Sequence, residues 1–268
     1  MFPASVPTLR SQDLLDASPQ PKFDIFSYHF YGAISRRCEA MSPSAGTRPE
    51  EALSEAWLAR TDVVFDFYKP LDDRYASGTP MWITETADSA CGGNPWAATF
   101  LDSFRYLDQL GRLARRGVAV IFHNTLASSE YGLLNQRDFT PRPNYWAALL
   151  WRRLMGFVVL DAGPLRPGLH IYAHCLHGRP GGVALLAINN SPSEHGLIDL
   201  PMPGERYTLS AEKLQSREVK LNGKPLVLGP DDRLPTLGGA PVASGAVALA
   251  PATITFIAVP QADNAACR

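Results

Sequence analysis

The sequence has 268 residues, with 25 basic and 26 acidic side chains and a formal net charge of −1. Apolar residues make up 46% and charged residues 19%, a globular composition that excludes a mainly disordered chain. The charge balance argues against nucleic-acid binding through bulk positive charge, and no apolar run reaches the roughly 20 residues of a membrane-spanning helix.

Residues 1–155 alternate β-rich runs with helical patterns. Pro49 stands near the first turn of the first helical pattern, and Gly117 follows the second, whose apolar residues recur every three or four positions. The run 118–122 is continuously apolar, as in a parallel strand that is buried on both faces. We predict strands at 23–31, 81–84 and 118–122, and helices at 49–68, 99–116 and 145–155. This order indicates three βα units of a parallel sheet.

Residues 156–268 have a different pattern, because short β-rich segments recur there without helices between them. Glycine, asparagine and proline separate the segments, as is typical of an antiparallel β-sandwich. We predict strands at 157–161, 169–175, 183–189, 207–210, 246–249 and 253–259. The sequence therefore predicts two domains, 1–155 and 156–268.

Polar side chains end all three predicted parallel strands. His29 and Tyr31 share one face of the first strand, Glu85 ends the second, and His123 and Asn124 end the third. Because the carboxyl ends of parallel strands meet at one rim, we expect these groups to converge. A single histidine is more often a structural hydrogen-bonding group, and a carboxylate there must be paired or functional.

A glutamate beside tyrosine, histidine and asparagine is typical of retaining glycoside hydrolysis, in which the carboxylate attacks the anomeric carbon. That mechanism also needs a second carboxylic acid roughly 5–5.5 Å away. No convincing candidate stands out: Asp88 is too close to Glu85 along the chain, Glu130 lies on the last βα loop, and Asp24 lies inside a predicted strand. The chemistry needs no metal and no cofactor.

Other chemistries are less well supported. The sequence has no Gly-x-Ser-x-Gly, phosphate-binding loop or His-Glu-x-x-His motif. His174, Cys175 and His177 are suited to metal binding, but a sandwich strand that runs into a polar turn explains them better. Cys91 lacks an adjacent base that would activate its thiol and receives no role.

Several strings resemble glycoside hydrolase family 79, which includes heparanase and β-glucuronidases. The resemblance runs in order from about residue 20 to residue 267. It is carried by YHFYG at 28–32, WITET at 82–86 with GG at 92–93, YGLL at 131–134 and NYWAALL at 144–150. It implies the C-terminal part of a TIM (β/α)8 barrel, about three βα units, followed by the β-sandwich.

The resemblance also implies roles for the rim residues. Glu85 corresponds to the catalytic nucleophile on the seventh barrel strand, and Tyr31 and His29 end the sixth strand beside it. Asn124 corresponds to an amide that contacts the sugar. The glucuronate carboxylate would be held by Tyr131 and the backbone N–H groups of Gly92 and Gly93.

Two cysteines match a pair that is bridged in heparanase. A Cys175–Cys267 disulfide would contribute about 4–5 kcal/mol by chain entropy, as for loops of roughly 100 residues. The alternative is two free thiols in a reducing compartment. Cys38 and Cys91 have no evident partner in the sequence.

Departures from the family pattern limit what this chain is expected to do alone. Cys91 stands where the animal enzyme has an aromatic residue, and one residue is inserted between Glu85 and the glycine pair. The family's Asn-Glu acid/base pair occurs nowhere in the sequence, which begins just before the sixth barrel strand. We interpret the chain as a fragment whose partner is the missing N-terminal half of the barrel. A decayed, complete product is the other account.

The expected substrate is a glucuronic-acid-containing glycoside or polysaccharide. Because the arginine clusters 112–116 and 152–153 read as solvated helix faces, a small or weakly charged glucuronide is favoured over a sulfated polysaccharide. No signal peptide is visible, yet the resemblance implies a secreted, periplasmic or lysosome-like full-length protein. The alternative function is a non-catalytic carbohydrate-binding or structural module.

Overall fold

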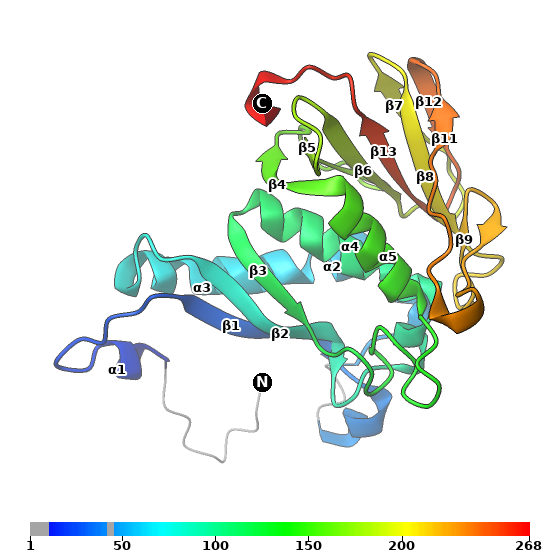
Figure 1. Cartoon of the computed structure of the whole chain (residues 1–268). Coiled ribbons are helices and arrows are strands. Elements are labelled where there is room, and N and C mark those ends of the chain that lie inside the picture. Colours follow the sequence, from blue (N-terminus) through cyan, green and yellow to red (C-terminus); the bar gives the residue numbers. More distant parts are fainter. Residues whose placement is uncertain (1–10, 42–45) are drawn as a thin grey trace.

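The structure, a computed structural model, describes residues 11–41 and 46–268. It combines a parallel sheet and antiparallel sheets with helices between them, so the fold is mixed α/β with an all-β part. Figure 1 shows α4 and α5 between the three parallel strands and the antiparallel sheet.

The parallel sheet has three strands in the order β1 (Phe26–Ile34), β2 (Met81–Ala90) and β3 (Val118–His123). His29 of β1 pairs with Glu85 of β2, and the register shifts on both sides of β2 close to that glutamate. All three strands run beyond their predicted ends, β2 most of all, because residues 86–89 stay buried and continue the pairing with β1. Glu85 therefore lies inside β2, at an irregularity of the sheet, and not after its end.

The helices differ from the predicted ones mainly near the N-terminus. The prediction of one helix over 49–68 is wrong: the Ser54 hydroxyl accepts from Trp57 N and starts a new helix, and the last helix of this region continues past Pro70. The helix predicted over 99–116 is α4. The α-helices are α1 (Ser11–Leu15), α2 (Glu55–Leu58), α3 (Arg60–Tyr75), α4 (Phe100–Arg115) and α5 (Pro143–Leu154), with short 3-10 turns at Arg36–Met41, Pro49–Glu51, Pro95–Ala98, Pro230–Asp232 and Ala265–Cys267.

The antiparallel part forms two sheets. One follows the order β10-β9-β8-β13-β6-β5-β4 with β11 beside β8, and the other pairs β12 with β7. The sequence did not predict β7, β9, β10 or β11, which are all five residues or shorter. The strands are β4 (Met155–Leu160), β5 (Leu169–Leu176), β6 (Val183–Asn189), β7 (Gly196–Leu200), β8 (Gly204–Ser210), β9 (Lys220–Leu221), β10 (Lys224–Pro225), β11 (Ala240–Val242), β12 (Gly245–Leu249) and β13 (Thr253–Val259).

The two halves share one hydrophobic core. Phe104 and Leu107 of α4 and Trp146 of α5 pack in one cluster with Leu186 of β6 and Phe256 of β13. Four of these five side chains are completely buried. The boundary predicted at 155/156 lies one residue into β4, directly after α5, and packing continues across it.

A buried polar network also joins the halves. His170 of β5 has no exposed surface; its Nδ1 lies 2.6 Å from Asp108 Oδ1 of α4, and its Nε2 lies 2.9 Å from Glu55 Oε2 of α2. Tyr172 also donates to Asp108 Oδ1, at 2.5 Å, and Arg112 donates to Asp108 Oδ2. These bonds satisfy polar groups that would otherwise be costly to bury.

Across residues 11–41 and 46–268, the helices are all too short or too polar to cross a lipid bilayer.

Candidate active site

Three neighbouring parallel strands bring three predicted site residues together: Tyr31 inside β1, Glu85 inside β2 and Asn124 directly after β3. The Tyr31 hydroxyl of β1 donates to Glu85 Oε1 of β2. The amide of Asn124, directly after β3, donates to the Tyr31 hydroxyl oxygen at 2.7 Å and lies 3.4 Å from Glu85 Oε1. The strand register therefore builds one hydrogen-bonded cluster around the glutamate.

His29 lies on the solvent side of this cluster. Its Nδ1 is 3.7 Å from Glu85 Oε2, and its side chain is 60% exposed while that of Glu85 is 39% exposed. The glutamate thus has one oxygen bound by Tyr31 and a second that faces His29 and solvent. A carboxylate held in this way is accessible to a ligand.

The Tyr31 hydroxyl keeps its proton. Burial is the main cause that raises the pKa of Tyr31 above its ordinary value, and the hydrogen bond to Glu85 raises it further. The protonated phenol donates its one hydrogen to the carboxylate, and its oxygen accepts from Asn124. Tyr31 therefore orients Glu85 by hydrogen bonding.

Tyr131, Gly92 and Gly93 lie together beside this cluster. The Tyr131 hydroxyl accepts from Asn124 Nδ2 at 3.3 Å, and the Tyr31 and Tyr131 ring centroids are 6.3 Å apart. Gly93 has a φ of +79°, and a Cβ at that position would lie 2.8 Å from the Tyr131 ring. Glycine is the residue that allows this close approach.

His123, which the sequence assigned to the same rim, is used differently. It is neutral, because burial lowers the pKa of its imidazole to about 4. Its Nε2 lies 2.7 Å from the backbone oxygen of Tyr131, and its ring packs edge-on against Tyr106. His123 supports the loop that carries Tyr131.

Asp88 is a buried member of the site region whose place the sequence did not reveal. Its Oδ2 accepts from Ser89 Oγ at 2.8 Å and from Asn94 N at 3.1 Å. Burial, followed by the charge of Asp102, raises the pKa of Asp88 to about 7. With no exposed surface, Asp88 cannot reach a substrate.

Cys38 and Cys91, for which the sequence showed no evident partner, are bonded to each other. They form a disulfide with Cα atoms 6.3 Å apart, which links the 3-10 turn after β1 to the loop after β2. The signal that the sequence offered was indirect: each cysteine follows a neighbouring parallel strand. The bond lies directly before Gly92.

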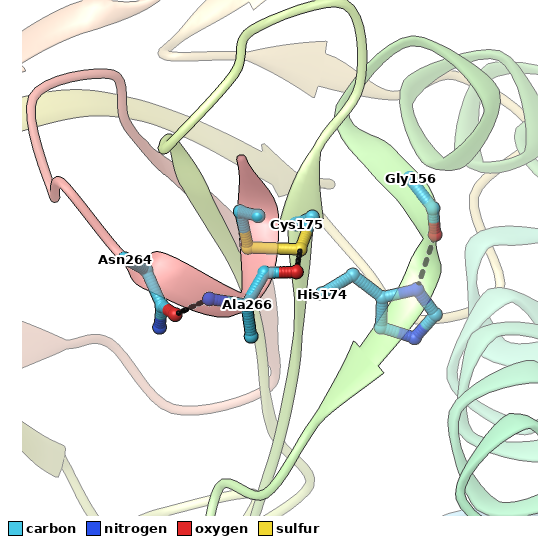
Figure 2. Close-up of a disulfide and its surroundings, with 6 residues drawn as sticks. Gly156, His174, Cys175, Asn264 and Ala266 are labelled. Atoms are coloured by element: carbon cyan, nitrogen blue, oxygen red, sulfur yellow. Dashed lines mark hydrogen bonds between the residues drawn. A yellow bond between two sulfur atoms is a disulfide. The ribbon is translucent and has the colours of Figure 1, made fainter.

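Cys175 and Cys267 are also bonded to each other, with Cα atoms 5.3 Å apart. Figure 2 shows this bond between β5 and the final 3-10 turn, with Asn264 Oδ1 accepting from Ala266 N in that turn. His174 Nδ1 contacts the Gly156 carbonyl oxygen of β4 at 2.7 Å. A metal site at 174–177 is not supported, because the Cys175 sulfur is in the disulfide.

Comparison with known proteins identifies relatives of this chain. It is 30% identical to Heparanase-like protein 1 of Arabidopsis thaliana over 95% of this chain and 53% of that protein. It is 29% identical to Baicalin-beta-D-glucuronidase of Scutellaria baicalensis (90% and 46%) and 30% identical to Inactive heparanase-2 of Mus musculus (72% and 37%). The resemblance to glycoside hydrolase family 79 is thereby confirmed, and the chain spans about half or less of each relative. No family model matches the chain.

Solved structures support the fold. A 4-O-alpha-L-rhamnosyl-beta-D-glucuronidase from Fusarium oxysporum superposes with a TM-score of 0.66 at 13% identity, over 87% of this chain and 52% of that one. At this identity the likeness concerns the fold alone. It places the parallel and antiparallel sheets of this chain in the architecture of a glycosidase with a TIM-barrel-like fold.

Proposed function

We propose that this chain is the nucleophile-bearing part of a retaining glycoside hydrolase that cleaves β-linked glucuronides. The observation that carries the proposal is the hydrogen-bonded cluster of Tyr31, Glu85 and Asn124 on three neighbouring parallel strands. The kinship with heparanase-like and β-glucuronidase proteins supports the same chemistry.

In this mechanism Glu85 acts as the nucleophile. Its free oxygen attacks the anomeric carbon as the glycosidic C–O bond breaks, and a covalent glycosyl ester forms. The leaving oxygen takes a proton from a second carboxylic acid, which later removes a proton from the water that hydrolyses the ester. Tyr31 keeps the carboxylate oriented throughout, and Asn124 is placed to bind a sugar hydroxyl.

The second acid is expected from outside this chain. The described residues offer no other accessible carboxylate in the cluster, and the sequence has no Asn-Glu pair. The three strands would then be the last three of a TIM barrel, completed by N-terminal strands. An exposed apolar face supports this: Phe122 is 49% exposed, and its ring centroid lies 6.0 Å from that of Trp82. Helices α3 and α4 cover the opposite face.

We assign the glucuronate carboxylate to the surface formed by Gly92, Gly93 and Tyr131. Both glycines have positive φ angles, a backbone conformation in which successive N–H groups can form an anion-binding concavity. A small glucuronide fits a protein of near-neutral charge better than a sulfated polysaccharide does. We place the full-length protein in a secreted, periplasmic or lysosome-like compartment, where the two disulfides would persist.

Covalent labelling tests the proposal. The complete gene product is incubated with a 2-deoxy-2-fluoro-β-D-glucuronyl fluoride, and peptides are analysed by mass spectrometry. We expect the fluoroglucuronyl group on Glu85 and no labelling of Glu85→Gln, whereas Glu212→Gln, an exposed control in the antiparallel part, labels like the wild type. Labelling that survives in Glu85→Gln would remove this residue from its role.

A second function is favoured by one observation, the match to a relative whose name describes it as inactive. A non-catalytic carbohydrate-binding module would bind glucuronides without turnover. The labelling experiment separates the two, because a complete gene product that binds p-nitrophenyl β-D-glucuronide but neither cleaves it nor becomes labelled supports the module.

A further inference from the structure

Two loops meet at the surface that we assign to the carboxylate. The loop after β2 contains Gly92 and Gly93, and the loop after β3 contains Glu130 and Tyr131. Glu130 N donates to the Gly92 carbonyl oxygen at 3.0 Å, and the Tyr131 ring contacts Gly93. The position of either loop therefore depends on the other.

The Arg142 side chain binds the main chain of the second loop, which contains Tyr131. Its Nη1 donates to the carbonyl oxygens of Ser129 at 2.8 Å, Glu130 at 2.6 Å and Gly132 at 3.3 Å, on both sides of Tyr131. Within the described part of the chain, its hydrogen-bond partners are all main-chain carbonyls. Burial lowers the pKa of the Arg142 guanidinium, yet arginine stays charged, so these bonds are charge-assisted.

Arg142 is itself firmly placed. It is the residue that precedes the first turn of α5, and α5 is anchored in the shared core by Trp146 and Leu150, which are 2% and 1% exposed. Tyr131 is itself buried in a small cluster with Ala87 and Ala97, and the main chain around it is positioned by such contacts with a rigid element. Because Arg142 is fixed at the start of α5, the hydrogen bonds of its guanidinium fix the main chain on both sides of Tyr131.

The Asp88 side chain binds the main chain of the first loop, which contains Gly92 and Gly93. Its Oδ2 accepts from Asn94 N, one residue after Gly93, while Oδ1 is buried without a hydrogen-bond partner among the described residues. A Cβ on Gly93 would lie 3.1 Å from that Oδ1. The charged groups near Asp88 are Asp102 and Arg105, both on α4.

We propose that Arg142 and Asp88 are positioning residues that hold Gly92, Gly93 and Tyr131 as one anion-binding unit. Neither residue touches the substrate. This inference rests on the proposed function, since it concerns the group that the glycines and Tyr131 would bind. The inference predicts an effect on binding and little effect on turnover. Replacing either residue should raise the KM for a carboxylate-bearing glycoside and change kcat little.

Arginine variants test this in the complete gene product. We expect Arg142→Met to raise the KM for p-nitrophenyl β-D-glucuronide about tenfold, since bonds to a charged group are lost, and to change kcat less than about threefold. The KM for the uncharged methyl ester should change little. Arg142→Lys, which keeps the charge but not the fork of donors, should recover part of the loss. The control Arg137→Met removes an exposed arginine from the same segment and should match the wild type.

Asp88→Asn adds a readout that a purely structural role would not change. In the wild type, ionisation of Asp88 near pH 7 places a negative charge beneath Gly93, so the KM for the glucuronide should rise above that pH. Asp88→Asn, which stays neutral, should remove this rise. Asp24→Asn, an exposed control, should keep it.

The outcomes distinguish this inference from the proposed function. If the wild type cleaves the glucuronide and Arg142→Met loses kcat equally on the acid and its ester, the positioning role is wrong. If the wild type cleaves no glycoside, the proposed function fails. Amide hydrogen exchange then decides the positioning: faster exchange over residues 125–134 in Arg142→Met, but not in Arg137→Met, supports it, and unchanged exchange overturns it.

Discussion

Tyr31 is the residue on which the geometry of Glu85 depends most directly, because its hydroxyl is bound to both Glu85 and Asn124. We expect Tyr31→Phe in the complete gene product to lower kcat/KM for a glucuronide about 10- to 100-fold, the effect of losing one hydrogen bond to a charged group. Steady-state kinetics measures this. Tyr145→Phe, on α5, is the control, and an unchanged kcat/KM in Tyr31→Phe would show that Glu85 does not need this donor.

At the residue scale, the sequence predicted those members of the cluster whose positions follow from the pairing of the parallel strands. Tyr31, Glu85 and Asn124 meet because the register of three adjacent parallel strands places them side by side, although Glu85 lies inside β2 and not at its predicted end. His123 takes the structural role that the sequence analysis gave as the more common one for a single histidine, because its imidazole contacts a carbonyl of its own loop. The Cys38–Cys91 bond depends on the conformations of the two segments that follow β1 and β2. The spacing of apolar residues in the sequence carries no information about these conformations.

At the scale of elements, α4 was predictable and the 49–75 region was not. The apolar positions of α4 recur at helical spacing over its whole length, and almost all of them are buried. The earlier region breaks at Ser54 because a side-chain cap competes with continuation of the helix. The short strand β7 was missed although its burial alternates strictly, since five residues give little pattern.

Gly111 of α4 offers a test of how tightly the two halves pack. A Cβ at this position would lie 2.4 Å from the ring of Tyr172 on β5, which is fully buried. Although alanine favours a helix by about 1 kcal/mol over glycine, overpacking costs about 1–3 kcal/mol, so we expect Gly111→Ala to destabilise the protein. Urea unfolding measures the midpoint. Gly238→Ala, with open space around it, is the control, and a Gly111→Ala midpoint at or above the wild type would contradict the packing.

At the scale of the whole molecule, the halves are held together by a core and a network that the sequence could not foresee. The composition predicted enough apolar residues for a core, but not that α4 and α5 would pack against β6 and β13 in one cluster. Nor did it indicate that His170 would lie between Asp108 and Glu55, which are separated from it by 62 and 115 positions. Such long-range pairs depend on the packed arrangement and leave no local pattern.

This network predicts how stability depends on pH. Burial acts to lower the pKa of His170, but the hydrogen bond and charge of Asp108, and then Glu55, raise it above its ordinary value. The protonated imidazole therefore stabilises the folded state fully below the unfolded pKa of about 6.5, and this contribution is lost as the pH rises through the raised folded pKa. The pKa values of Asp108 and Glu55 are lowered despite burial, so their contribution is instead lost as the pH falls below about 4.

We expect the difference in unfolding free energy between the wild type and His170→Gln to be largest near pH 5–6 and to shrink towards alkaline pH. Urea titrations at a series of pH values measure it, and the exposed His195→Gln is the control. Because His170→Gln removes the imidazolium between Asp108 and Glu55 and leaves Asp108 paired with Arg112 only, the variant His170→Gln/Asp108→Asn supplies a second comparison if the single variant does not fold. A difference that is constant from pH 5 to pH 9 would mean that the pKa of His170 is the same in the folded and the unfolded protein, and would contradict stabilisation by its ion pairs.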